Sequence, residues 1–476
     1  MVAVVPMTSY AGARISVVGL GREGLSVTRF LAGEGARVLV SDARSADALA
    51  QPIAALSGLD VRLSLGGHRE DEVLDCDLLV LSPGVDKRGP LVQEALRRGV
   101  PISSESEIFL ERCPARVVGI TGSAGKTTTT TLAGLMLQAG FKESERRVFV
   151  GGNIGRPLIE QVGEMTPRDW VVLELSSFQL EWLSRSPYVA VITNISPNHL
   201  DRHLTMDSYI QAKANIVAHQ SVADVAILNA DDGQVAALAA RTPGRVLQFT
   251  LGDTLPPASE GACLRAGRLV LALDGRTMEI CEAAALRIPG RHNIANALAA
   301  ATVAAVCGVA VRDIREVLGC FGGVAHRLQV VGTVDGVTYY DDSIATSPER
   351  TLAALAAIER PVILILGGRD KHLPWDGLAR AATLRARGVV LIGEAAGLIE
   401  SAFERVLDEC PSRLLQRPNI VHAPSMAAAV ERARGLARAG DAVVLAPGCA
   451  SYDMYRDFEE RGDDFVRAVR RLEGDG

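Results

Sequence analysis

The sequence predicts an α/β protein of three domains, and three observations support this prediction. The chain has 476 residues, which corresponds to about three domains at roughly 150 residues each. Short β-branched, apolar runs alternate with longer Ala- and Leu-rich stretches along the chain, a pattern typical of parallel sheets covered by helices. Two glycine-rich loops, beginning at Gly19 and Gly119, each follow an apolar run. One domain would not need both loops.

The apolar runs are expected to be buried strands, because their apolar residues are consecutive rather than alternating. The expected strands are Ile15–Val18, Arg37–Val40, Asp77–Leu81, Val117–Ile120, Trp170–Leu175, Val189–Thr193, Val225–Leu228, Pro361–Leu366, Gly388–Ile392 and Ala442–Leu445. The expected helices include Glu94–Arg98, Thr127–Gln138, Asn296–Val306 and Ser425–Ala437. The segment Cys263–Ile280 alternates in polarity around an Asp-Gly turn, which predicts a small antiparallel insert.

Two domain boundaries follow from the loops and the strands. One is expected near Cys113–Arg116, ahead of the second glycine loop, and the other near Gly322–Ala325, after a long helical stretch and before a fresh series of strands. The predicted domains are therefore residues 1–114, 115–325 and 326–476.

Charge and composition limit the possible partners. The formal net charge is −6, whereas a nucleic-acid-binding protein would need clustered Lys and Arg. The chain has no run of about 18 apolar residues, and its N-terminus lacks a basic segment followed by an apolar one. We therefore expect no nucleic acid, no membrane insertion and a cytoplasmic location. The eight Cys residues form no Cys-x-x-Cys pair, which favours reduced structural thiols over zinc or disulfides.

The strongest local motif is Gly119–Thr128, which reads GITGSAGKTT and lies between a strand and a helix. Its glycines let backbone amides wrap phosphate oxygens, and the helix N-terminus adds positive potential. Lys126 can neutralise phosphate charge, and the Thr127 hydroxyl can bind Mg²⁺. The motif lacks the first glycine of the strict GxxxxGK[ST] pattern and is the shorter TGxxGKT version. The alternative is a glycine-rich turn with no ligand.

The first glycine loop, Gly19–Gly24, reads GLGREG and is followed about twenty residues later by Asp42 at the end of the next strand. This spacing is a Rossmann-type fingerprint. By itself it is a weak motif. It usually indicates NAD(P) binding and hydride transfer. The alternative is a tight strand–helix turn that binds no ligand.

A third set of polar residues follows the strands of the middle region. Glu174 ends one strand and is followed by Ser176, and the segment Asn194–Asp201 with His199 follows the next strand. Carboxylates at the carboxyl ends of parallel strands, beside a phosphate loop, are well placed to bind Mg²⁺. Lys213, in a helical stretch, would by itself be a solvated surface lysine.

Together these segments resemble the Mur ligases and the related enzymes that add glutamate to folates. The motifs that carry the resemblance are TGSAGKTTT (121–129), GGNIG (151–155), LELSSFQLE (173–181), NISPNHLDRH (194–203), YIQAK (209–213), NADD (229–232), GRHNIANALAA (290–300), AHRLQVV (325–331), DDSIATSPE (341–349), LGGRDK (366–371) and APGCASYDMYRDFEERG (446–462). This ordered set is far more specific than either glycine loop alone.

Within that family the chain resembles the glutamate-adding branch, on the LELSSFQLE and CASYDMYRDFEERG segments. The resemblance implies a Rossmann-like N-terminal domain for the uridine diphosphate end of the substrate, a P-loop-type central ATPase domain and a Rossmann-like C-terminal domain. It implies that ATP phosphorylates the alanine carboxylate of UDP-N-acetylmuramoyl-L-alanine and that the amino group of D-glutamate attacks the acyl phosphate, a step of peptidoglycan precursor synthesis. Positioning and electrostatic stabilisation do most of the work in such chemistry.

The resemblance also implies the roles of individual residues. The ATP site would comprise Gly122, Ser123, Ala124, Gly125, Lys126, Thr127, Thr128, Asn293, Arg327 and Asp342. The substrate site would comprise Gly19, Arg22, Glu23, Asp42, Arg44 and Gly84 at the uridine diphosphate end, Asn153 and Ser176 nearer the metal, and Thr346, Lys371, Ser451 and Phe458 around glutamate. Two Mg²⁺ ions would involve Thr127, Glu174, His199 and an N-carboxylated Lys213. The catalytic set would be Lys126, His199, Lys213 and Asp342.

Three positions depart from the family pattern. Ala124 replaces an Asn of the phosphate loop, so one polar contact there is expected to be missing. Arg22 and Glu23 replace smaller residues, so the uracil contacts are expected to be rearranged. Ile344 replaces the Lys of a DSKAT segment, which leaves the choice between D- and L-glutamate open.

Other functions remain as alternatives. They are an L-glutamate-adding variant, another Mur or folylpolyglutamate-type ligase, an NAD(P) oxidoreductase and a non-enzymatic ATP-binding regulator. The oxidoreductase leaves the whole Thr121–Lys213 set unexplained, and an intact Lys126 and Glu174 argue against the regulator. The expected protein is a monomer.

Overall fold

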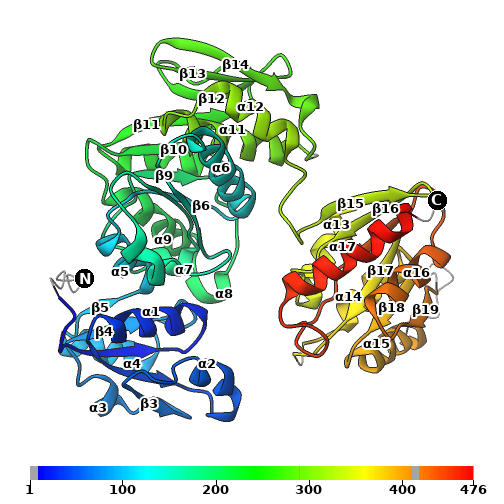
Figure 1. The fold of residues 1–476 in the computed structure, drawn as a ribbon, viewed down its shortest axis with the longest axis horizontal. Coiled ribbons are helices and arrows are strands. Elements are labelled where there is room, and N and C mark those ends of the chain that lie inside the picture. The colour runs from blue at the N-terminus through cyan, green and yellow to red at the C-terminus, as the bar shows by residue number, and fades with distance from the viewer. Residues whose placement is uncertain (1–8, 289, 372, 410–416, 475–476) are drawn as a thin grey trace. The chain divides into compact units, whose positions relative to one another are not determined.

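Two compact units make up the chain, Met1–Phe321 and Gly322–Gly476. The computed structural model describes residues 9–288, 290–371, 373–409 and 417–474. The first unit contains two sheets and the second contains one (Figure 1). Most strand pairs in all three sheets are parallel, so the predicted α/β class is confirmed. Across the described ranges, no helix is both long enough and apolar enough to cross a membrane.

The first sheet has five parallel strands in the order β3-β2-β1-β4-β5. The order reverses between β1 and β4, and ligands of such open sheets bind outside the carboxyl ends of the strands at this point. The strands are β1 (Arg14–Val18), β2 (Arg37–Asp42), β3 (Val61–Leu65), β4 (Leu78–Leu81) and β5 (Ile102–Ser103). The helices are α1 (Arg22–Gly33), α2 (Ala50–Ala54), α3 (Glu70–Val73), α4 (Pro90–Arg98) and α5 (Glu105–Arg112), with one 3₁₀ turn at Asp47–Leu49.

The second sheet has nine strands in the order β14-β13-β12-β11-β10-β9-β6-β8-β7. Its strands are β6 (Arg116–Thr121), β7 (Val148–Gly152), β8 (Trp170–Glu174), β9 (Val189–Ile192), β10 (Val225–Asn229), β11 (Arg245–Thr250), β12 (Glu260–Arg265), β13 (Arg268–Leu273) and β14 (Arg276–Glu282). Its helices are α6 (Lys126–Phe141), α7 (Ser177–Leu180), α8 (Leu200–His203), α9 (Met206–Ala218), α10 (Gly233–Ala237), α11 (Arg291–Val306) and α12 (Val311–Cys320), with 3₁₀ turns at Ile159–Glu164, Leu238–Arg241 and Ala283–Ala285.

The antiparallel segment expected at 263–280 is present but is not a separate insert. Strand β12 pairs in parallel with β11, so the antiparallel strands β13 and β14 extend the main sheet. The reason is packing: Leu269, Leu271 and Ile280 are fully buried, and β12 and β14 lie against α11 and α12. A free-standing hairpin would leave these side chains in water.

The third sheet, in the second unit, has six strands in the order β15-β16-β20-β17-β18-β19, of which only the β15–β16 pair is antiparallel. The strands are β15 (Gln329–Val334), β16 (Val337–Asp341), β17 (Val362–Gly367), β18 (Ala386–Ile392), β19 (Asn419–His422) and β20 (Ala442–Leu445). The helices are α13 (Pro348–Ala357), α14 (Asp376–Thr383), α15 (Ala396–Glu409), α16 (Met426–Leu436) and α17 (Phe458–Gly474). Separate buried clusters fill its two faces, as expected for strands covered on both sides.

All cysteines within the described ranges carry free thiols, in agreement with the expected structural role; Cys410 lies outside those ranges. Burial raises the pKa of Cys307 and Cys449 well above the ordinary range of a thiol. Such thiols stay protonated and behave as small apolar side chains.

Two glutamates are buried between helices of the first sheet and connecting segments of the second sheet. Glu105, at the start of α5, and Glu23, in α1, are both less than 10% exposed. Burial raises the pKa of both carboxyls, and the proximity of Glu23 raises that of Glu105 further. The side-chain amide of Gln179 donates a 3.0 Å hydrogen bond to Glu23, which offsets part of the cost of its burial. The pair therefore favours a protonated state in the fold.

This pair makes stability depend on pH. A glutamate ionises near pH 4.5 when unfolded, whereas the folded pair holds its protons to higher pH, so the folded state binds more protons and loses stability as pH rises above that value. We expect Glu105→Gln to raise the Tm of the first unit by several degrees at about pH 8 and far less at about pH 5, in calorimetric scans. Glu34→Gln, an exposed position after α1, is the control. A gain of equal size at both pH values would contradict the assignment.

Candidate active site

The predicted residues of the middle region meet at one edge of the second sheet. Strands β8, β6 and β9 are neighbours, so the segments that follow them leave the sheet side by side. They carry Glu174, the glycine-rich loop after Thr121, and Asn194 with His199. Strand β7 is the next neighbour beyond β8, and Asn153 follows it. The topology thus gathers residues that are far apart in the sequence.

The glycine-rich loop has a conformation that only glycine allows at two positions. Gly122 has φ +154°, and a Cβ there would lie 1.9 Å from the Thr193 hydroxyl. Gly125, immediately before α6, has φ +81°, and a Cβ there would lie 2.2 Å from the Asn296 side-chain oxygen. The loop therefore packs against β9 on one side and α11 on the other.

The backbone at Ala124 is held by polar contacts, although its side chain offers none. The Asn194 side chain accepts a 2.8 Å hydrogen bond from the Ala124 amide and donates a 2.9 Å bond to its carbonyl. The Thr193 hydroxyl donates to the same carbonyl at 2.6 Å. The backbone at Ala124 is thus held from the neighbouring strand, and the loop keeps its shape without an Asn side chain of its own.

Two lysine amines converge on one carbonyl of this loop. Lys126 and Lys213 each donate a 2.9 Å hydrogen bond to the Gly122 oxygen, and Lys213 also contacts the Thr121 hydroxyl at 3.3 Å. Lys213 is only 1% exposed. Desolvation, with the charge of Lys126 added, holds its pKa well below the usual range of a lysine, while Glu174 acts in the opposite direction. This shift favours the neutral amine of Lys213 over the ammonium.

Glu174 is the buried carboxylate of the site. One of its oxygens accepts a 2.7 Å hydrogen bond from the Asn153 amide, whereas the other, Oε2, is buried without a hydrogen-bond partner. Such an orphaned carboxylate oxygen is costly unless something else binds it, and a hard divalent cation would do so. In the described ranges, no group of three or more His, Cys, Asp or Glu side chains could hold a metal unaided. Phosphate oxygens and water would complete the shell, as is usual for Mg²⁺.

The remaining residues predicted for this edge are also nearby. His199 has φ +53° and is the N-cap of α8, and its ring lies 5.1 Å from that of Phe178. Ser176 is the N-cap of α7 and forms a capping box with Gln179. Thr127 and Thr128 lie in the first turn of α6, and Asn293, in the first turn of α11, bonds Asn296, which contacts Thr129 of α6.

A separate cavity of about 840 Å³ lies at the first sheet. All six residues predicted for the uridine diphosphate end line it: Gly19, Arg22, Glu23, Asp42, Arg44 and Gly84. Asp42 accepts hydrogen bonds from the Leu20 amide at 2.7 Å and from Arg44 at 2.7 and 2.9 Å. Burial would raise the pKa of Asp42, but these bonds outweigh it and hold the pKa at about 2. Asp42 is therefore an anion that fixes both the glycine loop and Arg44.

The structure explains the two unusual residues of the first glycine loop. Arg22 donates to the Gly155 carbonyl at 2.9 Å and to the Asn153 carbonyl at 3.0 Å, and Glu23 accepts from Gln179. Arg22 therefore binds the segment after β7, and Glu23 binds helix α7 after β8. Both side chains also line the cavity.

The predicted residues of the second unit gather at the carboxyl ends of β16, β20 and β17, which are neighbours. Arg327 and Thr346 lie in the loops before β15 and after β16, Lys371 follows β17, Ser451 follows β20 and Phe458 begins α17. Asp342 is buried, and burial raises its pKa to about 6, although the hydrogen bond donated by the Leu328 amide acts to lower it. Desolvation and the nearby Arg350 lower the pKa of Lys371. Arg350 also donates to the Ile344 carbonyl at 3.2 Å, so a cation lies beside the position that departs from the family.

Arg461, which the sequence did not single out, ties this edge together. Its guanidinium is 1% exposed and donates to the Ser343 hydroxyl, the Ser343 carbonyl and the Cys449 carbonyl at 2.9–3.2 Å. It therefore joins the loops after β16 and β20 to α17. Its position in FEERG was visible, but a single arginine in a helical motif gives no sign of burial.

Three family models match successive parts of the chain. They are the Mur ligase MurD-like N-terminal domain at residues 13–104, the Mur ligase middle domain at 120–304 and the Mur ligase glutamate ligase domain at 326–449. Together they follow the three sheets in order.

Curated relatives match over almost the full length. The UDP-N-acetylmuramoylalanine–D-glutamate ligase of Symbiobacterium thermophilum is 43% identical over 96% of this chain and 98% of its own. The enzyme of the same name from Pelotomaculum thermopropionicum is 41% identical over 96% and 98%.

Solved structures show the same fold at lower identity. The UDP-N-acetylmuramate-alanine ligase MurC of Thermotoga maritima is 20% identical, with a TM-score of 0.52 over 98% of this chain and 100% of that one. MurF of Acinetobacter baumannii is 19% identical, with a TM-score of 0.52 over 75% and 78%. The predicted three-domain architecture is therefore confirmed, and so is the resemblance carried by the motifs. The chain belongs to the Mur ligase family.

Proposed function

We propose that this protein is the ATP-dependent ligase that joins D-glutamate to the alanine carboxylate of UDP-N-acetylmuramoyl-L-alanine. The observation that carries the proposal is the match, at 43% identity over 96% of the chain, to a UDP-N-acetylmuramoylalanine–D-glutamate ligase. An oxidoreductase built on the first glycine loop alone would not explain why Mur ligase models match three successive parts of the chain. We further propose a monomeric, cytoplasmic enzyme with domains at 1–114, 115–325 and 326–476.

The edge of the second sheet would bind ATP. Amides of residues 122–125 and the start of α6 would surround the phosphates, Asn293 would lie near the adenine, and Lys126 would turn from the Gly122 carbonyl to the phosphates. A magnesium ion held by Glu174, Thr127 and phosphate would offset the charge of the transferred phosphoryl group. Arg327 and Asp342 are proposed to contact the nucleotide as well.

Lys213 would act as a carbamate. The neutral amine attacks the carbon of CO₂, an N–C bond forms, and the amine proton leaves to water, so a group with no charge becomes an anion. The lowered pKa supports this because an ammonium has no lone pair to react. The anion would then face Lys126, and with His199 it would serve a second magnesium ion.

The two substrates would bind at different sites. The cavity of the first sheet would hold the uridine diphosphate end, with Asp42 and Arg44 as polar anchors. Asn153 and Ser176 would contact the part of the substrate nearest the metal. Thr346, Lys371, Ser451 and Phe458 would bind glutamate, whose two carboxylates suit a lysine and hydroxyl donors. Once the carboxylate is an acyl phosphate, the glutamate nitrogen attacks its carbonyl carbon and phosphate leaves.

The acceptor assay tests the whole proposal. Phosphate release from ATP is measured with UDP-N-acetylmuramoyl-L-alanine and, in turn, D-glutamate, L-glutamate, L-alanine and diaminopimelate. We expect turnover with D-glutamate. Turnover with L-glutamate alone would replace the enantiomer and keep the reaction, whereas turnover with another acceptor would overturn the assignment. NAD(P) reduction without ATP use would point to the oxidoreductase.

Lys126→Ala tests the phosphate loop. We expect kcat/KM to fall at least about 10²–10³-fold, because charge on the transferred phosphoryl group is left uncompensated. Lys142→Ala, an exposed lysine at the other end of α6, should behave like the wild type. Near-normal turnover of Lys126→Ala would refute the role.

Lys213→Ala tests the carbamate. The alanine leaves a space that a short-chain carboxylate can enter and fill with negative charge. We expect activity that is greatly reduced and that recovers in part with added acetate or propionate, whereas Lys126→Ala should not recover. ¹³C NMR of the wild type with labelled bicarbonate should show a carbamate resonance that the variant lacks. If the wild type shows none, the modification is absent.

A further inference from the structure

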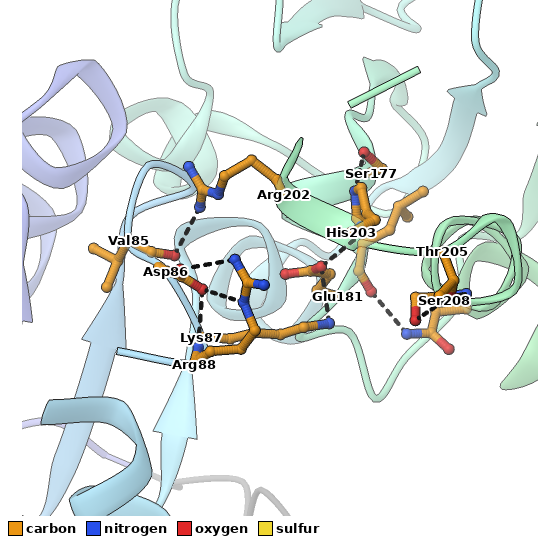
Figure 2. A network of polar contacts seen from close by, with 12 residues as sticks. Val85, Asp86, Lys87, Arg88, Ser177, Glu181, Arg202, His203, Thr205 and Ser208 are labelled. Carbon is orange, nitrogen blue, oxygen red and sulfur yellow. Dashed lines mark hydrogen bonds and ion pairs between the residues drawn. The ribbon is translucent and has the colours of Figure 1, made fainter. Parts of the chain in front are cut away.

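His203, at the end of α8, is a buried polar ring between the nucleotide loop and the cavity. Its Nε2 forms a 2.9 Å hydrogen bond with the Ser177 hydroxyl, and its Nδ1 lies 3.1 Å from the Glu181 carboxylate. Figure 2 shows both contacts around the ring. The side chain is fully buried, and none of the roles proposed above uses it.

The ring also packs between two aromatic residues of the site. It stacks in parallel on Phe178, with the centroids 5.2 Å apart, and meets Tyr209 edge-on at 5.1 Å. Phe178 in turn contacts the His199 ring at 5.1 Å. His203 therefore touches both the segment that follows β8 and helix α9.

Tyr209 carries the contact onward to the phosphate loop. Its hydroxyl forms a 2.9 Å hydrogen bond with the Ser123 hydroxyl, and the Lys213 amine lies 4.8 Å from the centre of its ring. A shift of the Tyr209 ring would therefore move a loop hydroxyl and change the environment of Lys213 together.

The segment around His203 also contacts the rim of the cavity. Glu181, beside the His203 ring, receives the Lys87 amine at 2.9 Å, and Arg202 donates a 3.2 Å hydrogen bond to the Val85 carbonyl. Figure 2 shows these contacts leading from the loop at Val85–Arg88 to α8. Val85 lines the cavity, so the rim and this segment are directly joined.

A purely structural role does not explain a histidine here. Between Phe178 and Tyr209 a phenyl ring would pack equally well, without two ring nitrogens to desolvate. The nitrogens are useful only for their partners, Ser177 and Glu181. The hydrogen bond to Ser177 fixes the rotation of the ring and so turns Nδ1 toward the Glu181 carboxylate, to which it makes no hydrogen bond, and the fixed ring positions the two aromatic neighbours.

We propose that His203 is a positioning residue that sets Tyr209, and through it Ser123 and Lys213, relative to His199. The inference rests on the proposed function, because it assigns a role within that ATP site. It predicts that loss of the ring nitrogens impairs the metal and phosphate geometry while the fold and the cavity persist.

The test compares His203→Phe, which keeps the ring and removes both nitrogens, with His203→Gln, which keeps a polar group and removes the ring. His422→Phe is the matched control, because His422 also has a carboxylate partner at 2.9 Å but lies in the second unit. Each variant is measured for Tm, for kcat and KM of UDP-N-acetylmuramoyl-L-alanine, and for Mn²⁺ affinity by EPR in the presence of a non-hydrolysable ATP analogue.

We expect His203→Phe to keep a Tm close to that of the wild type and to lose about tenfold or more in both kcat and Mn²⁺ affinity, with KM changed little. His203→Gln should recover part of the Mn²⁺ affinity if its amide reaches Ser177. Wild-type kcat and Mn²⁺ affinity in folded His203→Phe would overturn the inference, and so would equal losses in His422→Phe. A wild-type protein that ligates no substrate would instead refute the proposed function, and Mn²⁺ affinity would still decide the role of His203.

Discussion

The site depends on two lysine amines that share one carbonyl oxygen. Lys126 and Lys213 both donate to Gly122 at 2.9 Å, and two ammonium ions held this close in a buried place would repel strongly. Burial of Lys213 lowers its pKa well below the ordinary range of a lysine, which favours its neutral form and so reduces this repulsion. Lys126 can then keep its charge at the mouth of the loop, where an anionic nucleotide needs it. The burial that lowers the pKa comes from β6 and α9, so the electrostatics are a consequence of the fold.

The Glu174 carboxylate has one buried oxygen that no group of the protein binds, close to the buried amine of Lys213. Glu174 uses one oxygen to bind Asn153 and leaves the other buried without a hydrogen bond, a cost that a stable fold alone would not retain. Divalent cations and phosphate would satisfy both groups at once, since the cation binds the carboxylate and the loop amides bind the anion. The proposed carbamate at Lys213 would add one more negative charge with which a divalent cation could interact. The roles proposed for these residues would therefore account for both nucleotide binding and a requirement for a metal.

The sequence was sufficient for features set by local patterns and by topology. Continuous apolar runs predicted the strands, and the rule that parallel strands end at one edge placed Glu174 beside the phosphate loop. It was insufficient for features set by tertiary contacts. The strands β12 to β14 read as an independent insert, because burial against α11 and α12 cannot be seen in their alternation. Arg461 and His203 were not predicted to be functional, since a single polar side chain carries no local sign that it will be buried at the centre of a network.

At the positions that depart from the family pattern, contacts between separate segments fix the geometry of the two glycine loops. Ala124 lacks the side chain usual in the loop, and the segment after β9 holds its backbone, since Asn194 binds both its amide and its carbonyl. Arg22 is larger than the usual residue, and it uses its guanidinium to bind the carbonyls of Asn153 and Gly155. Through the Asn153 amide, this contact reaches Glu174. A residue that the sequence assigned to the uridine end is thus two contacts away from the expected metal, so substitutions in the cavity loop and at the metal site are not independent of one another.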